Sequence, residues 1–493
     1  MNRGAEVIET HISYVFLIGD RAYKLKKPIK TPFLDYSSRE ARLWACEREV
    51  ELNRRLSPDV YLGVASILDE HGQPCDSLVV MRRMPSERSL SRLVRARADV
   101  ADDVRKIARL MAGFHSLAPR SAAISTAAGI ESVRANWEAN FAEMRGSVGR
   151  VLDAAVAGRV ELLVRRYLSG RTSLFTDRVE GGMARDGHGD LKADDIFCLE
   201  DGPRILDCIE FDDRFRHGDV LDDVAFLAMD LERLGSPPLA RAFLSSYAEF
   251  SAESHPESLL HHYIAYRAHV RAKVACIRED QGDPSAGAEA RQLLGICLQH
   301  LEEARVRLIL VGGLPAAGKS TLASKLADRL GYDLVRSDEV RKELAGLAHD
   351  SPAAAPAGEG LYRRQLVEGA YDEMFRRARL ALERGVSVIL DATWRDAQMR
   401  EAARLLAQAT CADLVEIGCT APRSVLQRRL ARRKGRVAAS SDATLEVLDW
   451  MKFDQWPGSV DVDTSVAPSE SLAAAMELVT SGHSARSAAA ARP

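Results

Sequence analysis

The stretch "VRLILVGGLPAAGKSTLASKLADRL", residues 306–330, joins an apolar run, a glycine-rich turn and a helical pattern. Its opening "VRLILVGG" predicts a buried strand. Its last part predicts a helix, because Leu322, Leu326 and Leu330 recur every four residues and form one apolar stripe. Further strands are expected at "YDLVR" (332–336), "VSVILD" (386–391) and "LVEIG" (414–418). Strands that alternate with helices in this way predict an α/β domain with a parallel sheet.

The turn in this stretch matches a phosphate-binding pattern. Residues 313–320 fit GxxxxGK[ST] without a mismatch, between a strand and a helix. Glycines let backbone N–H groups turn toward phosphate oxygens, and the N-terminus of the helix adds a favourable dipole. We expect Lys319 to reach the β and γ phosphates of ATP and Ser320 to ligate Mg²⁺. The residues expected to bind the nucleotide are Gly313, Ala316, Ala317, Gly318, Lys319, Ser320 and Thr321.

Acidic and basic residues follow this loop at informative places. Asp338 comes just after the second strand and Arg341 one helical turn later, while Asp391 ends another strand. The run "PRSVLQRRLARRKGR" is rich in arginine. The combination resembles the small P-loop kinases of the polynucleotide kinase, zeta toxin and gluconate kinase group.

That resemblance implies roles for five residues. Asp338 would be a general base and Arg341 a phosphate-binding arginine, while Arg429 and Arg433 would be the lid arginines that stabilise charge on a transferring phosphoryl group. Asp391 would hold Mg²⁺ through water or contact the substrate. The alternatives are a helix N-cap for Asp338, a structural carboxylate for Asp391, and a solvated or nucleic-acid-binding helix face for the basic run.

A second motif, "HGDLKADDIF" at 188–197, lies in the first half of the chain and is followed by "RILDCIEFDD" from Arg204. The pair resembles aminoglycoside phosphotransferases and their eukaryotic-kinase-like relatives. The resemblance implies that Asp190 is the catalytic acid and that Asp195 and Asp207 bind metal. Asp195 stands where the family has Asn. The alternative is a degenerate domain that keeps the fold without the activity.

Asp195 changes the charge of this loop. A carboxylate is a good ligand for a hard cation, but a second negative charge beside Asp190 should raise its pKa and adds repulsion unless metal is bound. We expect metal binding to survive. Lys192, in the same loop, is expected to offset part of the added charge.

Residues upstream supply the cationic side of the same expected site. The strand "RAYKLKK" carries Lys24 and Lys26 on one face, and the helix "CEREVELNRRL" carries Glu49 as the ion-pair partner. A lysine on the α and β phosphates and a glutamate that orients it are what this architecture requires. Both lysines stay open, with Lys24 preferred. Met81, in "VVMRRMP", is expected at the hinge that contacts adenine through its backbone.

Composition sets the bounds on partners and location. The 493 residues suggest two or three domains, with 46% hydrophobic and 28% charged residues. The 68 basic and 71 acidic residues nearly cancel, so bulk charge indicates neither nucleic acid nor membrane as a partner. The eight scattered cysteines, and the lack of a signal segment or a long apolar run, predict reduced thiols in a cytoplasmic protein.

The expected fold is an α+β two-lobed protein-kinase-like domain (1–300), an α/β P-loop NTPase domain with a parallel sheet (301–480) and a disordered tail (481–493). The chain resembles bacterial fusions of an aminoglycoside-phosphotransferase-like domain with a P-loop kinase domain. This resemblance implies an ATP- and Mg²⁺-dependent phosphotransferase that acts on a hydroxyl of a small-molecule acceptor. Two alternatives stay open: an inactive N-terminal domain that binds or regulates, and a polynucleotide 5′-hydroxyl kinase, with nucleic acid the less favoured partner.

Overall fold

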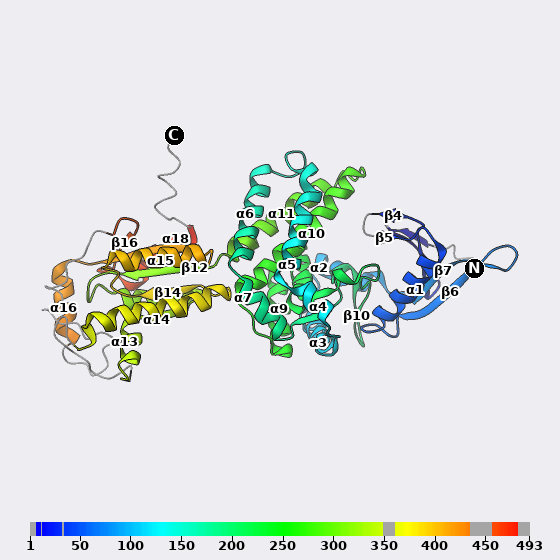
Figure 1. The fold of residues 1–493 in the computed structure, drawn as a ribbon. Helices are drawn as coiled ribbons and strands as arrows, with labels where there is room; N and C mark the ends of the chain where they lie inside the picture. Colours follow the sequence, from blue (N-terminus) through cyan, green and yellow to red (C-terminus); the bar gives the residue numbers. More distant parts are fainter. Residues whose placement is uncertain (1–5, 11, 32–33, 349–359, 434–455, 482–493) are drawn as a thin grey trace. The chain divides into compact units, whose positions relative to one another are not determined.

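The computed structural model describes residues 6–10, 12–31, 34–348, 360–433 and 456–481 (Figure 1). The chain divides into two compact units. Unit 1 contains Met1–Val164, Phe175–His255 and Leu259–Glu303, and unit 2 contains Arg165–Leu174, Pro256–Ser258 and Ala304–Pro493. The tail expected to be disordered lies outside the described residues, apart from its first residue. Among the described helices, none is long and apolar enough to cross a membrane.

Unit 1 begins with an antiparallel sheet of strand order β1-β2-β3-β7-β6. These strands are β1 (Glu6–Glu9), β2 (Ser13–Ile18), β3 (Arg21–Lys26), β6 (Tyr61–Leu68) and β7 (Pro74–Arg82). The alternating sequences "VIETHISYVFLI" and "RAYKLKK" around Gly19-Asp20 predict a strand pair joined by a turn. Strands β2 and β3 form this hairpin, with Gly19 in the turn at φ 59°. The stretch read as one strand before that turn forms both β1 and β2, which pair with each other. Strand β6 was missed by the sequence analysis.

One helix packs on this sheet. It is α1 (Arg39–Asn53), and the Ser38 side chain caps its N-terminus by accepting from the Ala41 amide. Its buried residues Cys46 and Val50 share a hydrophobic cluster with Val79. Helix α1 therefore carries Glu49 on the side that faces the sheet, where it is buried.

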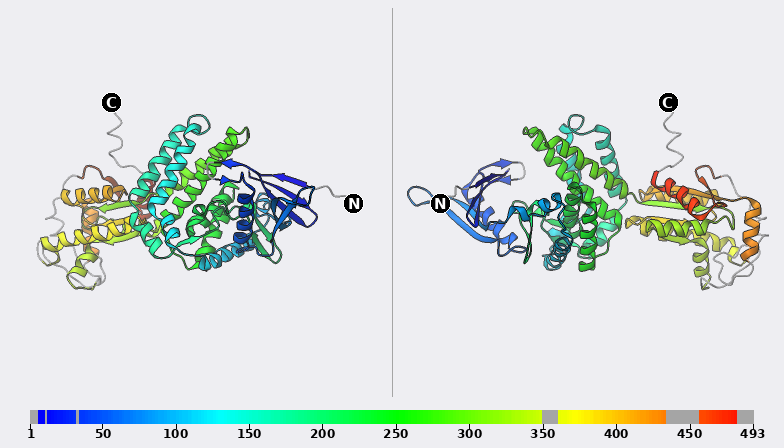
Figure 2. Two further views of the ribbon diagram at one scale, coloured as in Figure 1. Left: turned by 45° about the vertical axis from the view of Figure 1, so that its right-hand side comes forward. Right: turned by 180° about the vertical axis from the view of Figure 1, so that it is seen from behind.

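The rest of unit 1 is mainly helical (Figures 1 and 2). The helices that lie wholly in unit 1 are α2 (Leu90–Arg95), α3 (Ala101–Leu117), α4 (Ala122–Ala128), α5 (Ile130–Met144), α8 (Val220–Arg233), α9 (Pro237–Ser251) and α11 (Ala286–Glu303). Most residues of α6 (Ala154–Ser169), α7 (Thr172–Glu180) and α10 (Glu257–Asp280) also belong to unit 1, and the remaining residues of these three helices belong to unit 2. Short strand pairs lie between them in the sequence: β8 (Ala184–Asp186) with β11 (His217–Asp219), and β9 (Ile196–Leu199) with β10 (Gly202–Ile205). A further pair, β4 (Lys30–Thr31) and β5 (Leu34–Asp35), precedes α1. A sheet lobe followed by a helical lobe confirms the expected two-lobed class.

Unit 2 is built on a sheet whose described strand pairs are all parallel, in the order β13-β14-β12-β15-β16. Its strands are β12 (Arg307–Gly312), β13 (Asp333–Arg336), β14 (Val388–Asp391), β15 (Asp413–Thr420) and β16 (Val460–Asp463). Its helices are α12 (Lys319–Leu330), α13 (Ser337–Leu344), α14 (Arg364–Glu383), α15 (Ala397–Ala409), α16 (Arg423–Arg433) and α18 (Pro468–Ser481). The expected parallel α/β fold is confirmed, and β16 is an addition.

The glycine-rich turn follows the central strand of this sheet. Every residue of β12 is buried, which explains its continuous apolar sequence. Helices α15 and α14 lie on opposite sides of the sheet (Figure 1). Because β12 and β14 are neighbours and parallel, their carboxyl ends meet at one edge, where Val311 pairs with Asp391. This edge positions the phosphate-binding loop and Asp391 together.

Candidate functional site

One buried carboxylate, that of Asp223, binds the backbone at the start of the loop of residues 188–195. Asp223, in the first turn of α8, accepts from the amides of His188 at 2.7 Å and Gly189 at 2.8 Å, and lies 3.0 Å from His115 Nε2. Burial alone would raise the pKa of Asp223, but its hydrogen bonds with His115 and with the His188 amide hold the pKa below its usual range. Asp223 thereby fixes the backbone that precedes Asp190.

Glycine is required at position 189. Its φ is 86°, and a Cβ there would lie 2.7 Å from the Phe215 carbonyl oxygen. The motif histidine next to it is fully buried, and its Nε2 lies 3.1 Å from the Leu206 carbonyl oxygen. Burial lowers the pKa of His188, so this ring serves as a neutral tether between the loop and the residues before Asp207.

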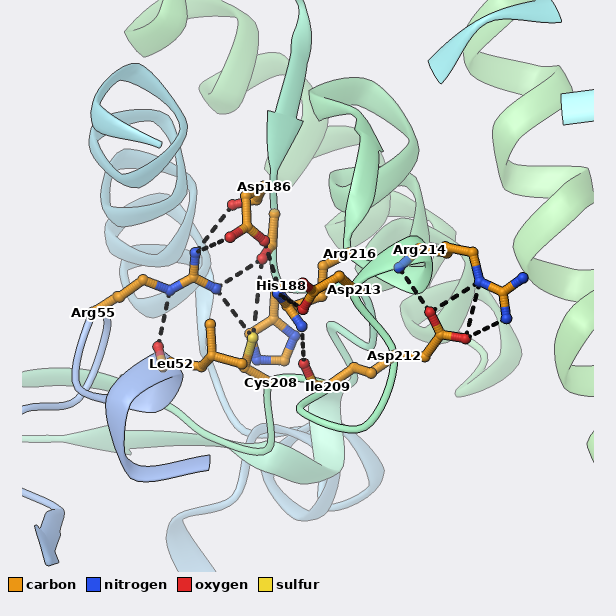
Figure 3. A network of polar contacts seen from close by, with 12 residues as sticks. Leu52, Arg55, Asp186, His188, Cys208, Ile209, Asp212, Asp213, Arg214 and Arg216 are labelled. Carbon is orange, nitrogen blue, oxygen red and sulfur yellow. Dashed lines mark hydrogen bonds and ion pairs between the residues drawn. The ribbon is translucent and has the colours of Figure 1, made fainter. Parts of the chain in front are cut away.

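A second network supports the start of the loop (Figure 3). Arg216 donates to Asp186 Oδ1 at 2.9 Å and to the Ile209 carbonyl at 2.7 Å, while Arg55 donates to the carbonyls of Asp186 and Gly187. The sequence analysis missed Asp186 and Arg216 and noted Asp223 only within "DDVAF" (222–226), a segment that resembles the start of the next helix in aminoglycoside phosphotransferases. The contacts of Asp223 with His188 and of Arg216 with Asp186 join residues 35 and 30 positions apart, so no local pattern indicated them.

Three carboxylates come together at the loop of residues 188–195 and just after β10. Carboxylate oxygens of Asp190, Asp195 and Asp207 all lie within 4.8 Å of one another. Asp207 follows β10 with a positive φ of 65°, and its amide donates to the Tyr61 hydroxyl at 3.1 Å. Three partly exposed carboxylates at this spacing form an oxygen donor set of the kind that Mg²⁺ prefers. The residues present therefore fit the metal expected at this site.

The two candidate lysines have different surroundings. Lys24 Nζ lies 2.8 Å from Glu49 Oε1 and 2.6 Å from Asp207 Oδ1. Lys26 is fully buried and pairs with Glu49 and Glu210, the latter also accepting from the Tyr36 hydroxyl at 2.8 Å. Lys24 therefore lies at the three carboxylates, whereas Lys26 supports Glu49 from the interior. This placement favours Lys24 for a role in the site.

The same contacts shift ionisation on both sides of the pair. Burial acts to lower the pKa of Lys24, but Asp207 and Glu49 raise it well above its ordinary value. The charge of Lys24, in turn, holds the pKa of Asp207 well below its usual range. Both groups are therefore charged at neutral pH.

Lys192 lies between the other two carboxylates. Its Nζ is 2.8 Å from Asp190 Oδ2 and 3.1 Å from Asp195 Oδ2. Burial and the nearby Asp207 and Asp190 raise the pKa of Asp195 to about 7, although Lys192 opposes the shift. The carboxylate that replaces the family's Asn is thus placed beside its own counter-charge.

Met81 lies next to the last residue of β7, and its half-buried side chain packs against the cluster of Cys46, Val50, Val60, Tyr61, Val79 and Leu206. Its strand partners are Ala22 in β3 and Tyr61 in β6. The side chain is therefore part of the core. The expected adenine contact through its backbone stays a prediction.

In unit 2 the phosphate-binding loop has an unusual backbone. Gly313, Ala316 and Gly318 have φ values of 138°, 64° and 87°. A Cβ on Gly313 would lie 2.5 Å from the Cys419 carbonyl oxygen, so only glycine fits there. Helix α12 begins directly after Gly318, at Lys319, and no side chain caps it. Its first amide groups therefore point into the loop as anion donors.

Asp391 lies at the edge that receives this loop. It is buried, and burial raises its pKa, although the Lys319 charge and a hydrogen bond with Ser320 act against the rise. Among the described residues, Asp391 Oδ1 has no hydrogen-bond partner. A buried carboxylate oxygen beside a serine hydroxyl fits a hydrated Mg²⁺ ion. Thr321 follows Ser320 in the first turn of α12, and its side chain is exposed.

Asp338 and Arg341 form an ion pair within α13. Arg336 occupies the N-cap position of this helix without a side-chain capping hydrogen bond, and Asp338 lies in the first turn, so the N-cap interpretation of Asp338 is wrong. Arg336 donates to Ser324 Oγ and to Glu339 Oε1, both at 2.6 Å. The sequence analysis missed Arg336.

The two expected lid arginines differ in what the structure describes. Arg429 donates to the Ala316 carbonyl oxygen at 3.1 Å and to the Thr464 carbonyl oxygen at 2.5 Å. The Thr464 hydroxyl donates to the Ala317 carbonyl, so Arg429 and Thr464 together brace the phosphate-binding loop. Arg433 ends α16, and its side chain lies outside the described residues.

Comparisons with known proteins agree with this architecture. The family model described as "AAA domain" matches residues 308–455. The Mycobacterium tuberculosis (strain ATCC 25618 / H37Rv) "Uncharacterized protein Rv2004c" is 44% identical over 462 residues, which cover 93% of this chain and 92% of that protein. The match to this family model confirms the expected P-loop domain in the C-terminal part of the chain.

Two solved structures are similar to parts of the chain. The structure of the GDP and kanamycin complex of APH(2")-IIia matches with a TM-score of 0.39 and 16% sequence identity. The match covers 61% of this chain and 93% of the APH(2")-IIia chain. A gluconokinase from Sinorhizobium meliloti 1021 matches with a TM-score of 0.26 and 18% sequence identity. The match covers 38% of this chain and 98% of the gluconokinase chain.

Proposed function

The chain belongs to one family with the Mycobacterium tuberculosis protein Rv2004c, and we propose that it is an ATP- and Mg²⁺-dependent phosphotransferase acting on a hydroxyl group of a small-molecule acceptor. The observation that carries the proposal is in unit 1. There Lys24 contacts both Glu49 and Asp207, and Asp207 shares one cluster with Asp190 and Asp195. A cationic side chain that can bind phosphate thus lies beside carboxylates that can bind a metal ion, and a nucleotide with a bound metal ion requires both.

Support for a second nucleotide site comes from unit 2. Its loop presents the uncapped N-terminus of α12, and Lys319 and Ser320 lie beside the buried Asp391. This loop carries the full GxxxxGK[ST] pattern, which is specific for nucleotide phosphates. Each unit therefore has its own set of phosphate-binding and metal-binding side chains.

Each side chain of the proposed site in unit 1 has its own role in phosphoryl transfer. Glu49 holds Lys24 in place, and Lys24 binds the α and β phosphates. Asp207 and Asp195 hold Mg²⁺, which supplies charge neutralisation to the phosphates when bound. A carboxylate oxygen of Asp190 orients the acceptor hydroxyl and accepts its proton.

In unit 2, Asp338 is the corresponding candidate to orient or deprotonate an acceptor hydroxyl, and Arg341 binds phosphate. Their ion pair links the first turn of α13, which carries Asp338, to its last turn, which carries Arg341. Ser320 and Asp391 hold Mg²⁺. Arg429 acts on the shape of the loop through the Ala316 carbonyl, and Arg433 remains a candidate lid arginine.

One observation favours a second candidate function. Because Lys192 already pairs with Asp190, the expected catalytic carboxylate of unit 1 is engaged before any substrate arrives. In this candidate, unit 1 binds a nucleotide or an effector without transferring phosphate, and unit 2 is the kinase. Asp195 would then mark the loss of catalysis in unit 1.

The test is Mg²⁺-dependent transfer of the γ-phosphoryl group from ATP to a panel of sugars, inositols, aminoglycosides and 5′-hydroxyl oligonucleotides. Wild type is compared with Asp190→Ala and Lys319→Ala. A product that disappears with Asp190→Ala assigns transfer to unit 1. Loss confined to Lys319→Ala supports the second candidate function, and a phosphorylated oligonucleotide supports a polynucleotide kinase.

Matched controls separate chemistry from folding. Asp201→Ala changes an exposed aspartate in the turn between β9 and β10, and Lys325→Ala changes a lysine on α12 beyond the loop. Both should leave transfer unchanged. Transfer by wild type that persists undiminished in the double variant Asp190→Ala/Lys319→Ala would contradict the proposal.

A further inference from the structure

A cluster of metal-binding side chains lies in unit 1 away from the three carboxylates. It consists of His261 on α10 and His300 and Glu303 on α11, whose ligand atoms all lie within 4.8 Å of one another. His300 and Glu303 are three residues apart on one helix and so share a face. His261 reaches the same point from the other helix. None of these residues takes part in the proposed phosphoryl transfer.

The two imidazole rings face each other through the same ring nitrogen. His261 Nδ1 lies 2.8 Å from His300 Nδ1, and Glu303 Oε2 lies 3.3 Å from His261 Nδ1. Only one proton can lie between two nitrogens at this distance, so at least one of them presents a lone pair to the other. A metal ion can replace that proton and use both lone pairs.

Glu232 on α8 orients His300 for this role. Its Oε2 lies 2.7 Å from His300 Nε2, so that nitrogen donates its proton to the carboxylate and Nδ1 stays free of hydrogen. A carboxylate behind a histidine in this way is the usual second layer of a metal site, because it sets the tautomer and raises the basicity of the ligand nitrogen. The cluster therefore has three candidate metal ligands, and one of them, His300, is oriented by Glu232.

We propose that His261, His300 and Glu303 bind one divalent transition-metal ion, with zinc the best match. Two imidazoles and one carboxylate suit zinc, whereas Mg²⁺ prefers oxygen ligands. Two nitrogens on a tetrahedral zinc ion lie roughly 3.3 Å apart, so the rings must separate by about 0.5 Å. His261 is partly exposed and on a separate helix, which leaves it room to move. The exposed Glu303 side leaves a fourth position for water.

The ion would join α10 to α11 near the C-terminal end of α11, where unit 1 ends. Metal that binds only the folded state stabilises it by mass action. This site is distinct from both proposed nucleotide sites, so it does not depend on the proposed transfer reaction. Its consequence is a metal-dependent stability of the helical part of unit 1.

The test uses the full-length chain, stripped of metal with a chelator and titrated with Co²⁺ in excess Mg²⁺, which occupies carboxylate sites. Visible absorption of cobalt reports nitrogen ligation, and Zn²⁺ should displace the signal. We expect saturation at one ion per chain, and its loss in His261→Gln and His300→Gln. Glu232→Gln should weaken binding by about 10- to 100-fold, the usual cost of losing such a support.

Controls keep the test decisive if a buried substitution disturbs folding. Glu303→Gln changes an exposed side chain and should weaken binding without unfolding the chain. His71→Gln removes an exposed histidine elsewhere and should change nothing. Zn²⁺ should raise the unfolding temperature of wild type and His71→Gln, and not that of His261→Gln. Cobalt binding that is absent in wild type, or undiminished in both His261→Gln and Glu303→Gln, would overturn the proposal.

Discussion

The ammonium group of Lys192 lies 2.8 Å from the carboxylate of Asp190, two residues before it in the same loop. It also contacts Asp195, the residue that stands where the family has Asn. One lysine thereby compensates two carboxylates at a place where the family pattern has one carboxylate and one amide. Lys192 therefore offsets part of the negative charge that Asp190 and Asp195 bring to the loop, and this compensation can be tested.

Replacing Lys192 with Met should destabilise the protein in Mg²⁺-free buffer, because Asp190, Asp195 and Asp207 then repel one another. We expect a loss of about 1–3 kcal/mol in the free energy of unfolding, less than for a fully buried pair, since these side chains are partly exposed. Added Mg²⁺ should restore most of the loss. Urea unfolding with and without Mg²⁺ measures both effects. Lys30→Met, at an exposed lysine, is the control, and a deficit that Mg²⁺ leaves unchanged would refute the metal site.

Lys24 and Lys26 should respond differently to substitution by Met. Lys24→Met should abolish nucleotide binding by unit 1, because Lys24 is the lysine that contacts Asp207. Lys26→Met should mainly cost stability, about 3–5 kcal/mol, because it leaves Glu49 and Glu210 less compensated in the interior. Calorimetric titration with an ATP analogue in a Lys319→Ala background, together with urea unfolding, separates the two. Equal nucleotide affinity of Lys24→Met and the background would contradict the assignment.

Arg429 should matter for nucleotide binding by unit 2 through the loop backbone. Arg429→Ala removes the donor to the carbonyl of Ala316, a non-glycine residue held at a φ of 64°, and so removes a support of this strained position. We expect ATP to bind about 10-fold more weakly, which corresponds to about 1.4 kcal/mol. Arg428→Ala, an exposed neighbour on α16, is the control. The affinity can be measured in an Asp207→Ala background, and equal losses in both arginine variants would point to bulk charge instead.

Stability should fall as the pH falls below about 6.5, the ordinary pKa of histidine. His269 is buried against Trp137 and Phe141, and burial, with the nearby Lys273 charge, lowers its pKa to about 3. Between these values the unfolded chain binds a proton that the folded protein excludes. The free energy of unfolding should therefore drop by about 1.4 kcal/mol per pH unit from this residue.

Urea unfolding of wild type and His269→Leu at a series of pH values checks this contribution. The variant should lose that part of the slope between pH 6 and 4, because leucine has no proton to bind and fills the same apolar site. His71→Gln, at an exposed histidine, should keep the wild-type slope. A slope that is the same in His269→Leu and wild type would show that another group sets the acid sensitivity.

Some elements could be predicted because their signal is local. The strand, turn and helix around 306–330 have continuous or periodic apolar residues, and the structure has β12 and α12 there. The strand β6 was missed, since its pattern is interrupted by Gly63, which has a φ of 158° within a register shift. Likewise, β1 and β2 form a hairpin that the alternation alone read as one strand.

The sequence by itself determined the chemistry of the chain: two phosphate-site motifs, their carboxylates and lysines, and the order of two kinase-like parts. Only the tertiary structure decided which lysine meets which acid, because Lys24, on β3, and Asp207, after β10, are 183 residues apart and meet only in the folded unit. The supporting contacts of Asp223, Asp186 and Arg429 were also beyond the sequence, although Arg429 itself was expected as a lid arginine. Their effect depends on hydrogen bonds to distant backbone groups, which leave no spacing rule in the chain.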